Sequence, residues 1–173
     1  MILRTVIGLA ALSAVLIVTA CSSTVSGIPS PDPRASSMTP SAGPQDALSA
    51  LDSCTILEQL VAGQGFEAGV RKTARNECHV SKPEYGTLSL ALDPQQGLAD
   101  LETQDAGRTP AEINGRRALV GEPERSGMCE VGLGVTEGSR ALVLVTLVNS
   151  DLYAQACPAA RDLATKLEPL LPR

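Results

Sequence analysis

Five cysteines constrain this chain of 173 residues more than any other feature of its sequence. Cys21 directly follows an apolar N-terminal run, and Cys54, Cys78, Cys129 and Cys157 are spread over the remainder with gaps of 24, 51 and 28 residues. Four cysteines in an exported domain predict two disulfide bonds. The fold must therefore bring these four residues together in pairs.

The sequence leaves three connectivities open. Cys78 and Cys129 lie in predicted strands, whereas Cys54 and Cys157 lie at predicted helix starts. This placement favours the pairs Cys54–Cys157 and Cys78–Cys129, while pairing of sequential neighbours stays open. A zinc site is disfavoured because metal ligands usually come as close pairs such as C-x-x-C, and the single histidine adds little. We therefore expect no metal and no other cofactor.

Residues 1–20 have the composition of a signal peptide. Arg4 supplies a positive charge, and an uncharged, mostly apolar run follows from Thr5 to Val18. The stretch up to Ala20 is shorter than the roughly 20 residues that span a bilayer core as a helix. We therefore predict cleavage between Ala20 and Cys21.

The segment Val18-Thr19-Ala20-Cys21 resembles the lipobox of bacterial lipoproteins. The resemblance implies a diacylglyceryl group on the Cys21 sulfur. Two acyl chains hold a protein firmly on a membrane, whereas one chain gives only marginal binding. We expect a lipid-anchored protein on the extracytoplasmic face of the cell membrane. The alternatives are an ordinary secretory signal with a chance cysteine and an anchor that is not cleaved.

Residues 21–45 form a predicted tether after the lipidated cysteine. The segment is rich in Pro and Ser and poor in apolar residues, so it cannot bury enough surface to offset its ordering entropy. Its prolines favour extended stretches and indicate a spacer between membrane and domain.

Residues 46–173 predict a single α+β domain, an antiparallel β-sheet with helices packed on one face. Apolar residues alternate at 88–92 and 129–136, which predicts strands with one buried face, and residues 117–121 indicate a short strand. The run 141–148 is apolar on both faces and predicts a central strand.

Helices are indicated in three places. Thr55 and Glu58 have the spacing of a capping box, which predicts a helix start at Thr55 and a stop near Gly63. Residues 97–104 indicate a short helix. Cys157 and Pro158 open the last helix, because proline is tolerated in a first turn.

Composition excludes some functions. The formal net charge is −5 and no cluster of Lys and Arg is present, so no nucleic-acid partner is expected. Phe66, Tyr85 and Tyr153 are the only aromatic residues, which disfavours a platform for stacking sugars or bases and predicts an aliphatic core.

Candidates for chemistry are few. His79 is the only histidine, and it follows Cys78 in a predicted strand, so its expected place is the solvated face rather than a catalytic site. Gly132 and Gly134 leave bare backbone on the non-core face of another strand. Two interpretations follow: a helix or loop of the domain packs there, or the two glycines form a binding face. The first is favoured.

The cysteine pattern also resembles the actinobacterial lipoproteins grouped as domain of unknown function 3558. The matching segments are Ser53-Cys54, Glu77-Cys78, Ile113-Asn114-Gly115-Arg116-Arg117-Ala118, Met128-Cys129-Glu130-Val131 and Ala156-Cys157-Pro158-Ala159-Ala160. The family often has Trp two residues after its second cysteine, where this chain has Val80. The resemblance implies a lipobox and a Pro/Ser-rich spacer but no activity.

These observations predict a membrane-anchored, non-enzymatic domain that binds a partner, with an envelope protein as the expected partner. The alternative is a carrier of a small apolar or lipid ligand held between sheet and helices. No arrangement of nucleophile and base, and no convergent pair of carboxylates, supports an enzyme.

Overall fold

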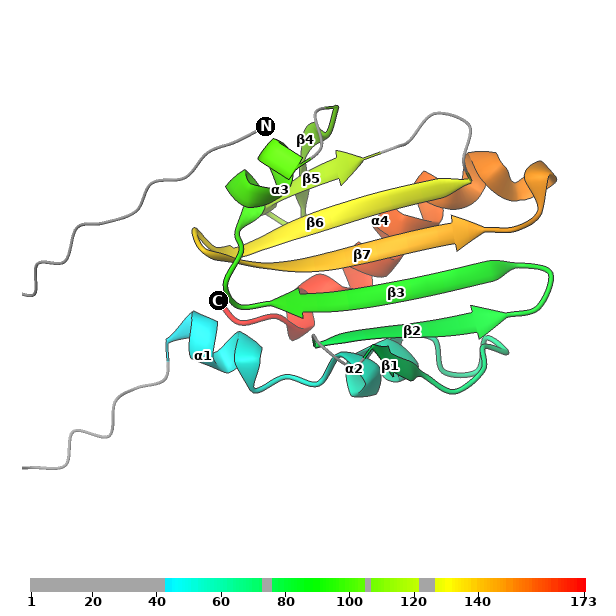
Figure 1. Cartoon of the computed structure of the whole chain (residues 1–173), viewed down its shortest axis with the longest axis horizontal. Helices are drawn as coiled ribbons and strands as arrows, with labels where there is room; N and C mark the ends of the chain where they lie inside the picture. The colour runs from blue at the N-terminus through cyan, green and yellow to red at the C-terminus, as the bar shows by residue number, and fades with distance from the viewer. Residues whose placement is uncertain (1–42, 73–75, 105–106, 122–126) are drawn as a thin grey trace, which may run out of the picture. The chain divides into compact units, whose positions relative to one another are not determined.

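The computed structural model describes residues 43–72, 76–104, 107–121 and 127–173, which all belong to one compact unit, Thr39–Arg173. Within these residues, seven strands form one antiparallel sheet in the order β1-β2-β3-β7-β6-β5-β4 (Figure 1). Their bounds are β1 Val70–Lys72, β2 Glu77–Lys82, β3 Gly86–Asp93, β4 Thr109–Ile113, β5 Arg116–Gly121, β6 Met128–Thr136 and β7 Ser139–Leu147. The predicted class, an antiparallel sheet with helices, is confirmed.

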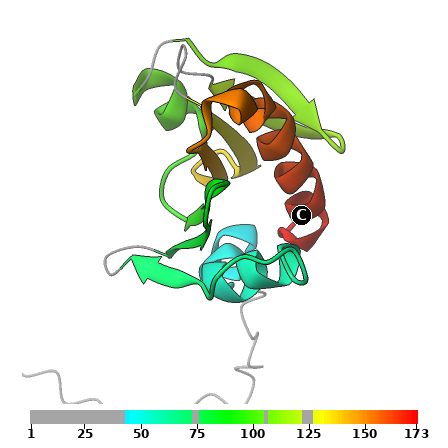
Figure 2. The same ribbon diagram turned by 90° about the vertical axis from the view of Figure 1, so that its right-hand side faces the viewer.

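The helices of the described part are short, apart from the last long one. They are α1 Pro44–Ser49, α2 Ser53–Leu60, α3 Leu98–Gln104 and α4 Ala156–Leu167, with 3₁₀ segments η1 Ser150–Gln155 and η2 Glu168–Leu170 around α4. Figure 2 shows the sheet curving, with α2 and α4 on its inner side. No helix in the described part is long and apolar enough to span a membrane.

The core lies between the sheet and the helices α1, α2 and α4. Alternate residues of β3, β6 and β7 point inward and are buried, as their period of two predicts: Leu88, Leu90, Leu92, Cys129, Val131, Leu133, Ala141, Val143 and Val145. The helices contribute Leu48, Ile56, Leu57, Ala160, Leu163, Ala164 and Leu167. The predicted aliphatic core is confirmed.

Strand β7 is the central strand, as its uniformly apolar run predicts. It pairs with β3 on one side and with β6 on the other. Its inner face carries the buried Val143 and Val145, whereas Leu142 on the outer face packs with α3. Both faces of β7 therefore contact other elements.

Helix α3 lies on the outer face of the sheet, whereas the other helices cover the inner face. Leu98 and Leu101 of α3 form a second small apolar cluster with Leu119 and Leu142, which point away from the main core. The short helix predicted at residues 97–104 is thus present, but it packs on the face opposite α4.

The predicted start of helix α2 differs from the structure. Helix α2 begins at Ser53 because the Asp52 carboxylate accepts a hydrogen bond from the Thr55 amide at 2.8 Å, so the capping box predicted at Thr55 is wrong. Glu58 instead accepts a hydrogen bond from the Gly69 amide at 2.7 Å. Helix α1 precedes α2, at Pro44–Ser49.

Candidate functional site

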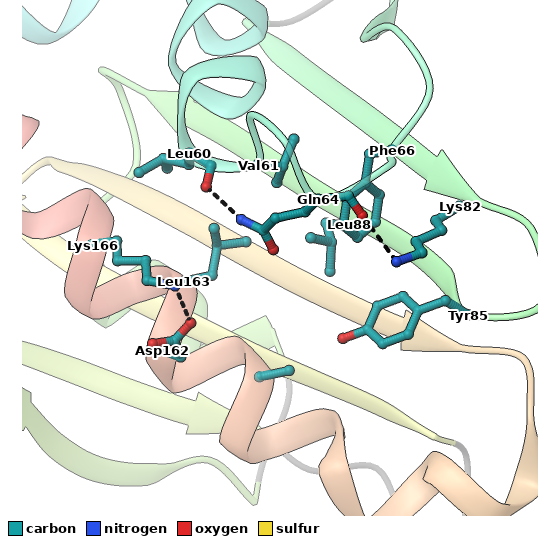
Figure 3. A pocket seen from close by; sticks show the side chains of 11 residues that line it. Leu60, Val61, Gln64, Phe66, Lys82, Tyr85, Leu88, Asp162, Leu163 and Lys166 are labelled. Atoms are coloured by element: carbon teal, nitrogen blue, oxygen red, sulfur yellow. Dashed lines mark hydrogen bonds and ion pairs between the residues drawn. The ribbon is translucent and has the colours of Figure 1, made fainter.

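A recess of about 160 Å³ opens between the end of α2, the loop that follows it, the β2–β3 hairpin and α4 (Figure 3). Its lining residues are Leu60, Val61, Gln64, Phe66, Lys82, Tyr85, Leu88, Ala159, Asp162, Leu163 and Lys166. The recess therefore combines two of the three aromatic side chains of the chain with two lysines.

The loop after α2 is shaped by two glycines with left-handed backbone. Gly63 and Gly65 have φ values of 74° and 79°, which residues other than glycine rarely adopt. The Glu67 amide donates to the Ser81 carbonyl oxygen at 2.8 Å and fastens the loop to β2. These turns place Phe66 against the hairpin, where its side chain is half-buried.

The β2–β3 hairpin brings Tyr85 to the same place. Lys82 and Gly86 are the last paired residues before the turn, and the Tyr85 amide donates to the Lys82 carbonyl oxygen at 3.2 Å. The Val148 amide donates to the Tyr85 carbonyl oxygen at 3.0 Å, which ties the turn to the end of β7. The rings of Phe66 and Tyr85 meet edge to face, with centroids 5.7 Å apart.

Lys82 sits at the rim of the recess over both rings. Its Nζ lies 5.8 Å from the Phe66 centroid and 5.9 Å from the Tyr85 centroid, within the range of cation–π attraction. It also donates to the Gln64 carbonyl oxygen at 2.9 Å. No carboxylate of the described residues pairs with this ammonium group.

Helix α4 supplies the opposite wall. Leu163 is buried at the base of the recess, and Asp162 and Lys166 stand at its edge. Their side chains form an exposed ion pair of 2.6 Å across one helical turn. The cation on this side is therefore already paired, unlike Lys82.

The chemistry of the recess suits binding. Its base is aliphatic, its polar groups stand at the rim, and its lining holds neither a histidine nor a thiol. Its single carboxylate, Asp162, is paired with Lys166. Among the described residues, no group of three or more His, Cys, Asp or Glu side chains could hold a metal ion.

A larger hollow of about 670 Å³ lies on the outer face of the sheet, beside the loop that leads to α3. Its buried Arg140 donates to the Gly97 carbonyl oxygen and to Gln96 Oε1, both at 2.9 Å. Glu130 pairs with Arg108, and Glu77 pairs with Lys72. Because its carboxylates are paired with neighbouring cations, this hollow is a weaker candidate than the recess.

Cysteine pairing differs from the connectivity that the sequence favoured. Disulfide bonds join Cys54 to Cys78 and Cys129 to Cys157, so the prediction of Cys54–Cys157 and Cys78–Cys129 is wrong. The physical reason is that each helix packs on a different strand. Helix α2 lies on β2, whereas α4 lies on β6 and β7, so each helix cysteine meets the strand cysteine beneath it.

The two glycines of β6 give room to helix α3. A Cβ atom at Gly132 would lie 2.5 Å from Leu101, and one at Gly134 would lie 3.1 Å from Leu98. Helix α3 therefore packs against both glycines, as the favoured interpretation expects. Gly134 also lines a hollow of about 490 Å³ beside Leu98 and Arg117, so the alternative of a binding face stays a prediction.

The remaining predicted residues are not part of the recess. His79 is half-buried on the outer face of the sheet, opposite the buried Cys78, and its Nδ1 has no hydrogen-bond partner in the described part of the chain. Ala20 and Cys21 lie outside the described residues. No residue predicted to act in binding thus lines the recess.

Sequence reasoning missed Phe66, Lys82 and Tyr85. The scarcity of aromatic residues argues against binding by stacking, whereas the fold brings Phe66 and Tyr85 together. The available signal was the segment Lys82-Pro83-Glu84-Tyr85-Gly86, a turn between two strands that carries an aromatic and a lysine.

The fold and the site define a disulfide-linked α+β domain with one aromatic-walled recess. The chain belongs to a family of proteins of unknown function, DUF3558, whose model matches residues 16–170. Comparison with curated proteins and with solved structures gives no match.

Proposed function

We propose that this chain is an exported lipoprotein, anchored through a diacylglyceryl group on Cys21, whose domain binds a partner in the cell envelope and catalyses no reaction. The two disulfide bonds support a location outside the cytosol. Disulfides persist in oxidising compartments outside the cytosol, and the sequence before Cys21 has the features of a signal peptide.

A binding role is supported by what the recess contains. An aliphatic base with a few polar groups at the rim is typical of sites that hold a ligand or a partner side chain. Its chemistry lacks a nucleophile beside a base, because Asp162 is held by Lys166 and His79 lies on the opposite face of the sheet.

A carrier of a small apolar ligand is the second candidate, because the recess lies between Leu88 of the sheet and Leu163 of α4. Its volume of about 160 Å³ limits such a ligand to the size of one side chain. Native mass spectrometry of the purified protein separates the two candidates, since a carrier retains a small molecule of constant mass.

The anchor is tested by mass analysis of the membrane-extracted protein together with a Cys21→Ser variant. We expect the wild-type protein to begin at an acylated Cys21 and the variant to lack the lipid mass and leave the membrane fraction. Ser22→Ala, one residue further on, is the matched control and should behave as wild type. A mature N-terminus elsewhere, or an unmodified Cys21, would contradict the proposal.

The binding role is tested separately by crosslinking in intact cells. We expect the wild-type protein to capture one envelope protein reproducibly. A form of the protein that lacks the anchor should not capture it. Absence of any reproducible partner together with a retained small molecule would replace this function by the carrier.

A further inference from the structure

The chemistry of the recess indicates which class of ligand it binds. We propose that it takes a small carboxylate whose apolar body is the size of one Leu or Phe side chain. The source is either a free acid or the C-terminal residue of a partner protein. The inference rests on the proposed binding function and adds the chemical class of ligand.

The volume sets the size of the occupant. A cavity of about 150 Å³ lined by apolar side chains accommodates benzene. The recess, at about 160 Å³, therefore accepts one branched alkyl or phenyl group but not a long acyl chain. A single buried anchor side chain of this kind commonly dominates a protein interface.

The lower part of the recess is made for an apolar body. Val61, Leu88 and Leu163 are buried, with 6%, 6% and 5% of their surfaces exposed, and they come from three different elements. The edge-to-face contact with Tyr85 holds the Phe66 ring in place at the side. An apolar group that enters removes its own surface, and the small remaining exposed surface of these side chains, from water, which favours binding.

The rim supplies the charge. The Lys82 ammonium group has three N–H donors. Among the described residues, its only hydrogen-bond acceptor is the Gln64 carbonyl oxygen. The Tyr85 hydroxyl points from the hairpin across the recess toward α4 in Figure 3, and it forms no hydrogen bond with the described part of the chain. A carboxylate in the recess can accept from the Lys82 ammonium group, and the Tyr85 hydroxyl offers a further donor.

One unpaired ammonium group suits a monoanion. Lys166, the other lysine of the recess, is held by Asp162 at 2.6 Å, so only Lys82 can take a new anion without loss of an existing pair. The Phe66 and Tyr85 rings keep its ammonium near the rim even though the chain as a whole is acidic, with a net charge of −5.

The test uses the mature lipoprotein in lipid nanodiscs and ligand-observed saturation-transfer NMR. The free acids are 4-methylpentanoate and 3-phenylpropanoate, and their primary amides serve as uncharged counterparts. Two peptides that end in Leu, one with a free C-terminus and one amidated, represent the protein source. We expect each carboxylate to bind more tightly than its amide.

Three variants localise the binding. Lys82→Gln should weaken binding of the carboxylates by about two- to fivefold, which is the range for an exposed ion pair. Binding of the amides should be unchanged. Lys72→Gln, which makes the same charge change on β1 outside the recess, should alter neither. Ala159→Leu fills the recess and should abolish binding of every probe, with an unchanged circular dichroism spectrum as its folding control.

The probes distinguish the two sources of the carboxylate, and the variants show which results contradict the inference. Tighter binding of the peptide than of the free acids supports a protein C-terminus, and the reverse supports a free acid. Equal effects of Lys82→Gln and Lys72→Gln, equal binding of acids and amides, or no binding at all would overturn the inference. Acylation of Cys21 and crosslinking are measured without probes, so those results decide the proposed function independently.

Discussion

Asp52 caps the N-terminus of helix α2, and its carboxylate oxygen accepts a hydrogen bond from the Thr55 amide at 2.8 Å. The backbone hydrogen bond from Thr55 is the main cause that lowers the pKa of Asp52, and the Arg71 guanidinium adds to it. A single ionised side chain thus fixes the start of the helix that carries Cys54. Acid should therefore weaken the N-terminal end of this helix.

The expected pH effect has a definite sign. Because the pKa of Asp52 is lower in the folded than in the unfolded chain, the contribution of its carboxylate is fully present above the ordinary Asp pKa and is lost as pH falls through the folded value. Hydrogen exchange at the α2 amides should accelerate on acidification, relative to the intrinsic rate.

Asp52→Asn is the matched variant for this measurement, since an amide oxygen still accepts the Thr55 hydrogen bond but does not titrate. The variant should show a flatter dependence on pH in the same amides. Identical profiles for the wild type and Asp52→Asn would contradict the role of the ionised carboxylate.

At the scale of elements, Arg116 joins β5 to the segment after α4. It donates to Glu168 Oε1 at 3.0 Å, to the Gly134 carbonyl oxygen at 3.0 Å and to the Pro172 carbonyl oxygen at 2.9 Å. The side chain of Glu168 is only 2% exposed. The ion pair therefore fixes the C-terminal end of the helix layer to the sheet.

Replacement of Arg116 by Met should lower the free energy of unfolding by about 3 kcal/mol, because it leaves a buried carboxylate without its main partner. Lys166→Met removes an exposed ion pair on the same helix layer and should cost at most about 0.5 kcal/mol. Denaturant titration of both variants measures the difference. Equal losses would show that burial of Glu168 has no energetic consequence.

For the whole molecule, the disulfide bonds tie each half of the chain to itself. Cys54–Cys78 joins α2 to β2, and Cys129–Cys157 joins β6 to α4. Neither bond crosses from the N-terminal strands to the C-terminal ones. The two halves are held together instead by β3–β7 pairing and by the shared core.

Because the two bonds close loops of similar length, 24 and 28 residues of sequence separation, their contributions should be alike. Removal of either pair by double Cys→Ala substitution should cost about 3–4 kcal/mol of unfolding free energy in the chain-entropy model. Non-reducing peptide mapping should recover the two linked peptides. A peptide that links Cys54 to Cys157 would contradict this structure.

What the sequence by itself determined is the part that local pattern controls. Alternation of apolar and polar residues at 88–92 and 129–136 predicted β3 and β6, and the apolar run 141–148 predicted the central β7. Successive side chains of a strand point to opposite faces, so the sequence pattern shows whether one face or both are buried. The family resemblance was likewise contained in short segments and is confirmed over residues 16–170.

Only the tertiary structure decided which local pieces meet. The cysteine pairing depends on which strand each helix crosses, and the place of α3 depends on the space that Gly132 and Gly134 leave on the outer face. The recess joins Phe66, after α2, to Lys82 and Tyr85 of the β2–β3 hairpin. Such contacts depend on how the chain packs in space, which residue spacing along the sequence does not encode.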